Sequence, residues 1–502
     1  MENELGRQVP ENAGSYRELQ PFSGSWDEDI VQKNDKLASL EEVLDNLDIK
    51  DGMTISFHHH FREGDLLINM IIDKLAEMGI KDLTLASSSL ANVHSHIIKH
   101  IKNNVITKIQ TSGLRGELGE EISRGLMDDP VIIRSHGGRA GAIETGRLEI
   151  DVAFLAAPSA DRAGNISGSR GKSTCGSLGY ARVDARNADR VVAFTDNLVE
   201  FPAKNISIPQ RLVDYVVEVD KIGNPEDIAS GALRKPTNMN PKNMIIAEKV
   251  AQIISSSSCF KGNFSMQTGS GTISLATIDI LKDRMKEKNV KGSFMMGGIT
   301  GGHVDLLEEG YFDVIYDTQT FDMAAIESIR KNENHLEIDA ADYANPFNKA
   351  PLVNDLDFMI LSALEIDLDY NVNVITGSDG VFRGASGGHS DTAAGSEISI
   401  VVAPAIRGRI PTIKDKVNTV ITPGEDIDIL VTERGVCVNP KREDLRRDIE
   451  ENTTIKPINI EKLKNRVEKL TGKPGSIEYK DNIVGLIEYR DGSIIDVVRE
   501  VK

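Results

Sequence analysis

A glycine-rich segment that also carries a cation and an imidazole is the most informative chemical feature of this 502-residue sequence. It spans residues 377–389, and long glycine-rich loops inside compact domains are usually functional. Backbone N–H groups of Gly387 and Gly388 would suit a developing oxyanion, because glycine lets the backbone approach a ligand closely. Arg383 and His389 add a carboxylate-binding cation and a hydrogen-bonding ring.

A second glycine-rich segment lies between a predicted strand and a predicted helix. Backbone N–H groups at such a helix start can bind a phosphate or an oxyanion. A tight turn between strand and helix would use the same residues, and the sequence leaves both interpretations open. The segment consists of Gln267, Thr268, Gly269, Ser270 and Gly271.

Two arginines flank a Ser-His-Gly-Gly segment at residues 135–138. The guanidinium group binds carboxylates and phosphates with two parallel hydrogen bonds, so Arg139 is a candidate anion ligand. Alternatively, Arg139 and Arg147 pair with Glu144 and Glu149 on the surface.

Other chemistries are not supported by their residue spacing. Neighbouring side chains in His58–His60 would point to opposite sides of an extended chain, so we expect a histidine lining a cleft and no metal site. The segment 168–174 is no phosphate-binding P-loop, because Ile166 occupies the position of a required glycine. Glu365 is either a catalytic carboxylate or a structural charge next to a cation.

The composition limits the compartment and the partners. The sequence has 58 Lys and Arg against 77 Asp and Glu, a net charge of −19 and a pI near 5.1, which argues against nucleic acid and anionic membranes as partners. Cys175, Cys259 and Cys437 are far apart and do not form a disulfide framework. Neither an apolar signal segment nor a membrane-length apolar run is present, so we expect a cytoplasmic protein.

The elements that would position these residues alternate between strands and helices. Residues 54–57, 65–78 and 83–86 predict a strand, a helix and a strand, which together form a βαβ unit. The same order recurs about 210 residues later, with strands at 264–267 and 292–296 around a helix that begins near Thr272. Further apolar runs, 131–133 and 372–376, also predict strands.

The predicted fold class is α/β, with two similar open α/β domains and a small α+β C-terminal extension. The extension holds a helix with Ile460, Leu463, Val467 and Leu470 on one side, and a hairpin that turns at Asp491-Gly492. We place an N-terminal arm at 1–35, the first domain at 36–225, the second domain at 226–440 and the extension at 441–502.

Several stretches, taken together and in this order, resemble the CoA-transferases. The resemblance covers nearly the whole chain, and two segments, 171–199 and 361–395, resemble the citrate lyase alpha chain family in particular. The stretches that carry the broader resemblance are 136–139, 151–165, 267–271, 387–391 and 431–436.

One departure from the CoA-transferase pattern is informative. Typical CoA-transferases carry a glutamate shortly before an Asp-Gly pair, and this glutamate becomes a covalent thioester. Here the matching positions are about Gly297 and Gly301-Gly302, so the nucleophile is missing. Citrate lyase alpha chains are similarly thought to work without it.

The resemblance implies an exchange on an acyl-carrier subunit. Acetyl-carrier and citrate would give citryl-carrier and acetate, with no covalent glutamyl-CoA intermediate. The thiol would belong to a phosphoribosyl-dephospho-CoA arm on a gamma chain, or to acetyl-CoA, with no permanently bound cofactor. A beta chain would then cleave citryl-carrier to oxaloacetate and regenerate acetyl-carrier within a larger oligomeric complex.

In this interpretation a citrate carboxylate attacks the acetyl thioester directly. We expect Gly387 and Gly388 to supply backbone donors, His389 to donate near the thioester, and Arg139 with Arg383 to bind citrate carboxylates. The loop of Gln267, Gly269, Ser270 and Gly271 would hold the thioester arm. The alternatives are a transferase that uses free CoA with acetate or another small acid, and a non-catalytic α/β binding or scaffold subunit.

Overall fold

The computed structural model of the protein describes residues 1–11, 19–22, 35–228, 240–269 and 271–502. The chain divides into two units, residues 1–36 and residues 37–502. In the first unit Glu2 and Gln8 form an isolated antiparallel bridge, and their side chains share a hydrogen bond of 2.9 Å. Among the described residues, no helix has both the length and the apolar character of a membrane span.

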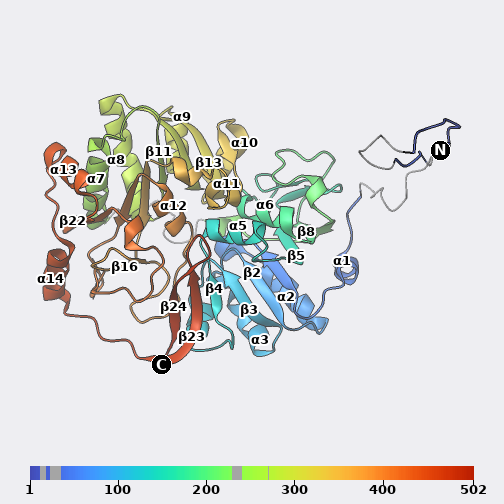
Figure 1. Ribbon diagram of the computed structural model, residues 1–502, viewed down its shortest axis with the longest axis horizontal. Coiled ribbons are helices and arrows are strands. Elements are labelled where there is room, and N and C mark those ends of the chain that lie inside the picture. Colours follow the sequence, from blue (N-terminus) through green and yellow to red (C-terminus); the bar gives the residue numbers. More distant parts are fainter. Residues whose placement is uncertain (12–18, 23–34, 229–239, 270) are drawn as a thin grey trace. The chain divides into compact units, whose positions relative to one another are not determined.

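The first large sheet of the second unit has nine strands, and its seven strands from β10 to β4 run parallel (Figure 1). Helices α1 to α6 belong to the same part of the chain. In spatial order the strands are β10 (Tyr215–Glu218), β8 (Arg190–Thr195), β5 (Val152–Ala156), β1 (Thr54–Phe57), β2 (Leu83–Ser87), β3 (Ile106–Thr111), β4 (Val131–Ile133), β23 (Tyr479–Glu488) and β24 (Ile494–Val501). The helices are α1 (Leu40–Leu47), α2 (Leu67–Glu77), α3 (Ile97–Lys102), α4 (Gly116–Ser123), α5 (His136–Glu144) and α6 (Gly179–Asn187).

The second large sheet has eight strands, of which only the last is antiparallel to its neighbour. In spatial order the strands are β14 (His335–Glu337), β13 (Phe312–Thr320), β12 (Gly292–Ile299), β11 (Phe264–Thr268), β15 (Phe358–Ser362), β18 (Ile398–Val402), β21 (Ile429–Thr432) and β22 (Gly435–Val438). Its helices are α7 (Pro241–Ser256), α8 (Thr272–Lys288), α9 (Gly301–Glu308), α10 (Met323–Lys331), α11 (Ala340–Ala344), α12 (His389–Gly395), α13 (Glu443–Asn452) and α14 (Ile460–Thr471).

The two sheets share one strand order. The first runs β4-β3-β2-β1-β5-β8-β10 and the second runs β14-β13-β12-β11-β15-β18-β21. In both, the chain adds three strands to one side of the first strand and then crosses to the other side. The prediction of two similar open α/β domains is therefore confirmed. Each sheet has a switch point beside its first strand, and ligands of open α/β sheets bind outside the carboxyl ends of the strands there.

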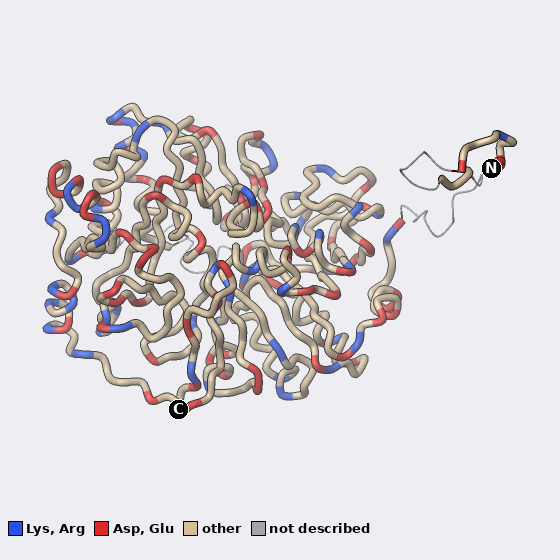
Figure 2. The backbone as a smooth tube through the Cα atoms, in the orientation of Figure 1, with Lys and Arg blue, Asp and Glu red and all other residues tan. Residues whose placement is uncertain are grey.

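Both faces of the second sheet are covered by helices, and successive side chains along its strands pack into different apolar cores. In β18, Ile398, Ile400 and Val402 pack in a core with α7, α8 and α13, whereas Val401 packs in a core with α14. The charged residues lie mostly on helices and loops, and both signs are interspersed along the outer helices (Figure 2).

Two details differ from the expectations of the sequence analysis. Leu470 was expected on the apolar side of α14, but its side chain is 62% exposed. The strand expected at 372–376 is reduced to β17 (Val372–Asn373), which pairs with β16 (Glu365–Ile366). The side chain of Asn373 accepts the N–H groups of Ile375 and Thr376, each at 3.0 Å, and this local turn ends the strand.

The C-terminal hairpin completes the first sheet. Strand β23 lies parallel to β4, and the buried Arg134 beyond β4 forms two hydrogen bonds with Glu488 at the end of β23, at 2.7 and 2.8 Å. The turn at Asp491-Gly492 was predicted correctly, and Gly492 has a φ of 89°, which favours glycine. Pairing of β23 with β4 has no signal in local sequence patterns.

An aspartate stands immediately before four of the parallel strands and accepts a backbone N–H from the start of the neighbouring strand. These carboxylates bind N–H groups near the point where the strand pairing begins. The aspartates form two equivalent pairs: those before β5 and β15 occupy matching places in the two sheets, and so do those before β10 and β21. The pairs are Asp151 with Thr54 (2.7 Å), Asp214 with Val191 (2.7 Å), Asp357 with Ser265 (2.8 Å) and Asp428 with Ser399 (2.9 Å).

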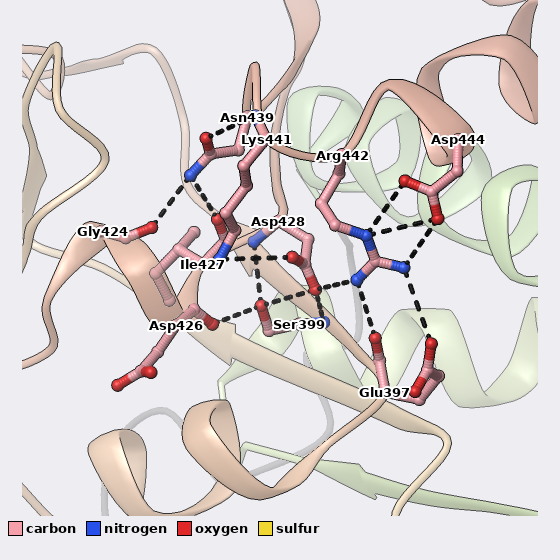
Figure 3. A network of polar contacts seen from close by, with 10 residues as sticks. All are labelled: Glu397, Ser399, Gly424, Asp426, Ile427, Asp428, Asn439, Lys441, Arg442 and Asp444. Atoms are coloured by element: carbon pink, nitrogen blue, oxygen red, sulfur yellow. Dashed lines mark hydrogen bonds and ion pairs between the residues drawn. The ribbon is translucent and has the colours of Figure 1, made fainter.

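Asp428, one of these four aspartates, takes part in the network of polar contacts shown in Figure 3. Its carboxylate accepts the N–H and the hydroxyl of Ser399 and lies 3.1 Å from the guanidinium of Arg442. The side chain of Asn439 donates to the Ile427 carbonyl at 2.7 Å, which fixes the loop before β21. The network therefore connects β18, β21 and the segment that leads into α13.

Asp428→Ala is expected to lower the free energy of unfolding by about 3 kcal/mol, because a buried N–H and a partly buried guanidinium lose their carboxylate. The matched control is Asp444→Ala, which removes a carboxylate also 3.1 Å from Arg442 but 57% exposed. We expect that control to lose about 0.5 kcal/mol. Urea unfolding followed by circular dichroism measures both variants, and equal losses would contradict the assignment.

Candidate active site

The carboxyl edges of the two sheets meet through a short stretch of backbone contacts, which we call the joint (residues 112–114 and 384–387). Leu114 N–H donates to the Gly384 carbonyl at 3.0 Å, and Ser386 N–H donates to the Ser112 carbonyl at 2.7 Å. A Cβ added to Gly113 would lie 2.3 Å from the Cβ of Ala385, so only glycine permits this approach. The joint places the ends of β3 and β4 beside the 377–389 loop.

Further contacts between the edges continue from the joint. His136 N–H, at the start of α5, donates to the Gly387 carbonyl at 2.8 Å. Asp391 in α12 accepts the Ser135 hydroxyl at 2.7 Å and the Gly137 N–H at 2.8 Å. Burial raises the pKa of Asp391 to about 6. The segment 135–138 and the loop before α12, which the sequence analysis singled out separately, thus form one structure.

Tyr343 in α11 brings the two predicted glycine loops together. Its hydroxyl accepts the side-chain amide N–H of Gln267 at 3.0 Å, and a Cβ on Gly388 would lie 2.3 Å from the same oxygen. Gln267 and Gly388 therefore converge on one buried hydroxyl. No spacing in the sequence pointed to Tyr343. Ser270 of the predicted loop lies outside the described residues.

The backbone donors predicted at Gly387 and Gly388 lack acceptors in the part of the chain that the structure describes. Both glycines are half-buried, and Gly387 has a φ of 57°. Two unpartnered N–H groups at the edge of a buried site suit an oxyanion. Gly269 N–H, by contrast, already donates to the Ile360 carbonyl at 2.8 Å.

His389 is buried at the start of α12. Its Nδ1 lies 2.8 Å from the Thr422 hydroxyl, and its Nε2 has no hydrogen-bond partner among the described residues. Burial lowers the pKa of His389 to about 4, so the ring is neutral at physiological pH. A neutral ring with Nδ1 accepting from Thr422 carries its proton on Nε2, where a ligand atom can accept it.

Arg139 and Arg383, the arginines predicted to bind a carboxylate ligand, are both paired with carboxylates of the chain. Arg139 is buried and binds both oxygens of Asp184, at 2.7 and 2.8 Å, and Asp184 also lies 3.0 Å from His58. Arg383 is 46% exposed and pairs with Asp379 at 2.6 Å and with Glu120 at 3.4 Å. The predicted surface pairs of Arg139 with Glu144 or Glu149 do not form.

Two other arginines, which the sequence analysis passed over, have no carboxylate partner among the described residues. Arg62 lies beyond the carboxyl end of β1 and Arg115 beyond that of β3, just before α4. The Arg62 guanidinium lies over the Phe321 ring, 4.9 Å from the ring centroid. Burial, and next the charge of Arg115, lower the pKa of Arg62 to about 10. Burial likewise lowers the pKa of Arg115. Both side chains are half-buried, and the charge of Glu63 acts on both and opposes these shifts. Two like charges beyond the carboxyl ends of strands, with no carboxylate at ion-pair distance among the described residues, form a candidate anion site.

The backbone of Arg62 supports a functional role. Its φ is 55°, a left-handed conformation that residues other than glycine rarely adopt. Glu63, the neighbouring carboxylate, accepts the backbone N–H groups of Asn92 and Val93, at 3.4 and 3.2 Å. The signal that could have revealed Arg62 was its place directly after the strand and the histidines at 58–60.

Three stacked rings border these cations. His59, His136 and Tyr180 lie with ring centroids 4.4 to 5.6 Å apart, and His59 Nδ1 is 2.6 Å from the Ser88 hydroxyl. Burial lowers the pKa of His136 to about 3, with Arg139 and Arg115 adding to the effect, and burial also places the pKa of His59 well below its usual value. The rings therefore add neutral hydrogen-bonding groups, and the positive charge belongs to the arginines.

The position of the missing glutamate is filled by backbone and an amide. Gly297 in β12 has a φ of 98°, and a Cβ added there would lie 3.0 Å from the side-chain amide of Gln267. The neighbouring strand β13 also contacts the first sheet, because the side-chain amide of Gln319 donates to the His59 carbonyl at 3.0 Å. A carboxylate nucleophile is thus absent from this position, as the sequence analysis predicted.

Glu365 has the structural surroundings that the sequence analysis offered as one of two alternatives. It is buried, with Lys414 Nζ at 3.3 Å and the Asn373 side-chain amide at 3.1 Å. As for metals, one group of described residues could hold an ion. It consists of Asp73 on α2, His96 at the end of the 3-10 helix η2 (Asn92–His96) and His100 on α3, away from the joint.

Comparisons with known proteins agree on one family. Residues 33–501 match the family model of the citrate lyase alpha subunit. The citrate lyase alpha chain of Haemophilus influenzae is 53% identical over 464 residues, which cover 92% of each chain. That of Escherichia coli K12 is 52% identical over 465 residues, which cover 93% of this chain and 91% of the relative.

Solved structures give the same result. A crystal structure of a putative citrate lyase alpha subunit from Streptococcus mutans, in complex with citrate, is 52% identical and superposes over the whole of both chains with a TM-score of 0.91. The malonate decarboxylase alpha subunit of Acinetobacter baumannii, at 14% identity, covers 87% of this chain and 88% of its own with a TM-score of 0.64, and shares the fold.

Buried imidazoles at and near this site make stability sensitive to acid. Burial lowers the pKa of His303 to about 4, alongside the values for His136 and His389 given above. Below about pH 6.5 the unfolded chain binds a proton at each histidine, whereas the folded chain does not. The free energy of unfolding should therefore fall by about 1.4 kcal/mol per pH unit for each histidine between about pH 6.5 and pH 4. Urea unfolding at several pH values measures the slope of the free energy of unfolding against pH. His389→Gln should make this slope smaller, because one proton fewer is taken up on unfolding. An unchanged slope would contradict the assignment.

Proposed function

Because the chain belongs to the citrate lyase alpha subunit family, and so is a citrate CoA-transferase, we propose that it moves a carrier thiol from acetyl-carrier to citrate with citrate held by Arg62 and Arg115. The products are citryl-carrier and acetate. The observation that supports this proposal best is the pair of half-buried guanidinium groups with no carboxylate at ion-pair distance among the described residues.

Citrate is a trianion at neutral pH, and its charge matches this pair. Binding a carboxylate between Arg62 and Arg115 offsets the repulsion between two half-buried cations and satisfies their N–H groups. The neutral rings of His59, His136 and Tyr180 can donate to the remaining carboxylate and hydroxyl oxygens without adding charge. This assignment replaces Arg139 and Arg383 as citrate ligands, because each of those would have to leave an existing ion pair.

In the proposed reaction a citrate carboxylate oxygen attacks the acetyl thioester carbon. The tetrahedral intermediate collapses as the C–S bond breaks, which gives an acetyl-citryl anhydride and the carrier thiolate. The thiolate then attacks the citryl carbonyl carbon, and acetate leaves. Both steps develop an oxyanion, and the free N–H groups of Gly387 and Gly388 are placed to stabilise it, with His389 donating nearby. Holding the two reactants together supplies a further several kcal/mol.

We place the thioester arm along the loop between β11 and α8. The side chain of Gln267 faces the position of the missing nucleophile, and Gly269 and Gly271 allow the arm to approach the backbone. The arm is the phosphoribosyl-dephospho-CoA group of a gamma chain, which acetyl-CoA can replace, and no cofactor is permanently bound. A beta chain cleaves the citryl-carrier, and the complex works in the cytoplasm.

Arg115→Met is expected to raise the KM for citrate at least about tenfold, because a charge-assisted hydrogen bond of about 1.5–3 kcal/mol is lost. The KM for acetyl-carrier should change less than about twofold. The matched control is Arg124→Met, at the residue directly after α4, where the side chain is 55% exposed and pairs with Glu120 and Glu121. Steady-state kinetics measure both KM values for each variant. Equal increases in the two KM values for Arg115→Met would contradict the assignment of citrate to this site.

The purified chain with acetyl-CoA and labelled citrate should release acetate only when citrate is present, and intact-mass analysis should find no acyl or CoA adduct on the protein. A CoA adduct would mean that a carboxylate such as Glu365 is the nucleophile, and the anhydride route would be wrong. If no acetate is released with acetyl-CoA, the acetylated gamma chain is added in its place. Activity would then show that the chain depends on the carrier, and continued inactivity would show that it has no catalytic role.

A further inference from the structure

A cluster of one carboxylate and two imidazoles lies on consecutive helices of the first sheet. Asp73 comes from α2, His96 from the short 3-10 helix η2 (Asn92–His96), and His100 from α3. His96 Nε2 lies 2.9 Å from each oxygen of Asp73, and His100 Nε2 lies 2.7 Å from one of them. The ligand atoms of the three residues lie within 4.8 Å of one another.

We propose that Asp73, His96 and His100 bind a zinc ion. In a tetrahedral site with bonds of about 2.0–2.2 Å, ligand atoms are about 3.3 Å apart. The carboxylate–nitrogen separations of 2.7 and 2.9 Å are shorter than that value, and all three ligand atoms lie within 4.8 Å of one another, so adjustments of about an ångström would admit the ion. Two imidazole nitrogens and one carboxylate oxygen are a common ligand set for zinc, and water would take the fourth position.

The spacing of the histidines supports this geometry. His96 and His100 are four residues apart across the junction of η2 and α3, so their side chains lie on one side of the same turn. Both present Nε2 to the same carboxylate. The His100 side chain is 5% exposed, so packing fixes its ring, whereas His96 and Asp73 are partly open to solvent and leave an entry for the ion.

Lys99 is the group that the ion must displace. Its Nζ lies 2.9 Å from the Asp73 oxygen that also contacts both histidines, so three donors converge on one atom. The Lys99 side chain is 50% exposed, and a surface ion pair of this kind contributes about 0–1 kcal/mol. Losing it is therefore a small penalty next to three bonds to zinc.

A bound ion would connect α2 to α3. These two helices are the crossovers that follow β1 and β2, and they pack against each other. Since the unfolded chain does not hold the three ligands together, zinc binding would stabilise the folded state. The role inferred for the ion is structural, and it is independent of the citrate site.

Zinc titration of the full-length chain, first freed of metal with a chelator, tests the proposal by calorimetry and by thermal unfolding. We expect one zinc ion per chain and a higher Tm with zinc. His96→Ala and Asp73→Asn should each weaken binding at least about tenfold, since even the loss of groups that only orient ligands costs that much. Lys99→Met should change affinity in the opposite direction, because it removes the competing cation.

The spectrum of bound Co2+ in place of zinc distinguishes binding at this site from binding at one of the three cysteines. Thiolate ligands give Co2+ an intense near-ultraviolet band, which nitrogen and oxygen ligands do not give. The expected spectrum has weak visible bands alone, and these should disappear in His96→Ala. Absence of zinc binding, unchanged affinity in both His96→Ala and Asp73→Asn, or a thiolate band would each overturn the proposal. Lys99→Met, which retains all three ligands, shows whether a loss of binding in the other variants reflects general damage to α2 and α3.

Discussion

Backbone hydrogen bonds at the joint are the constraint on which the rest of the candidate site depends. A backbone N–H reaches a carbonyl only at about 3 Å, so the contacts of residues 112–114 with 384–387 fix one carboxyl edge relative to the other. Gly113 makes this approach sterically possible. The contact of His136 with Gly387, and the convergence of Gln267 and Gly388 on Tyr343, follow from that placement.

The electrostatics of the site follow from its burial. Imidazoles that would otherwise titrate near neutrality are held uncharged, and the nearby acid Asp184 is already neutralised by Arg139. Among the described residues of the site, Arg62 and Arg115 are cations with no carboxylate at ion-pair distance, and the charge of Glu63 acts on both from farther away. A site with two such cations and no carboxylate at Gly297 suits a substrate that brings its own nucleophilic carboxylate, because an enzyme carboxylate there would repel it.

Local patterns in the sequence were sufficient to predict several elements and the repetition of the fold, because buried strands and amphipathic helices have distinct apolar periods. These elements are strands β1, β2, β4, β11 and β12 and helices α2, α8 and α14. The glycine loops were found for a similar reason, since glycine marks close backbone approach. The partners of charged groups could not be predicted in this way. Arg139 meets Asp184, 45 residues away, and Arg134 meets Glu488, 354 residues away. Such pairings depend on which strand ends become neighbours. Local patterns therefore pointed to Arg139 and Arg383 as carboxylate ligands and gave no signal for Arg115 or Tyr343, and only a weak one for Arg62.

The place of β23 beside β4 has a consequence for how the chain is made. Residues 479–501 leave the ribosome long after the other strands of their sheet, which end at residue 218. Until then β4 is an open edge with unpaired N–H and C=O groups, which invites pairing with another nascent chain. The first sheet therefore cannot reach its final form until β23 and β24 have been synthesised. A message that ends early would give a product with an exposed edge rather than a smaller stable domain.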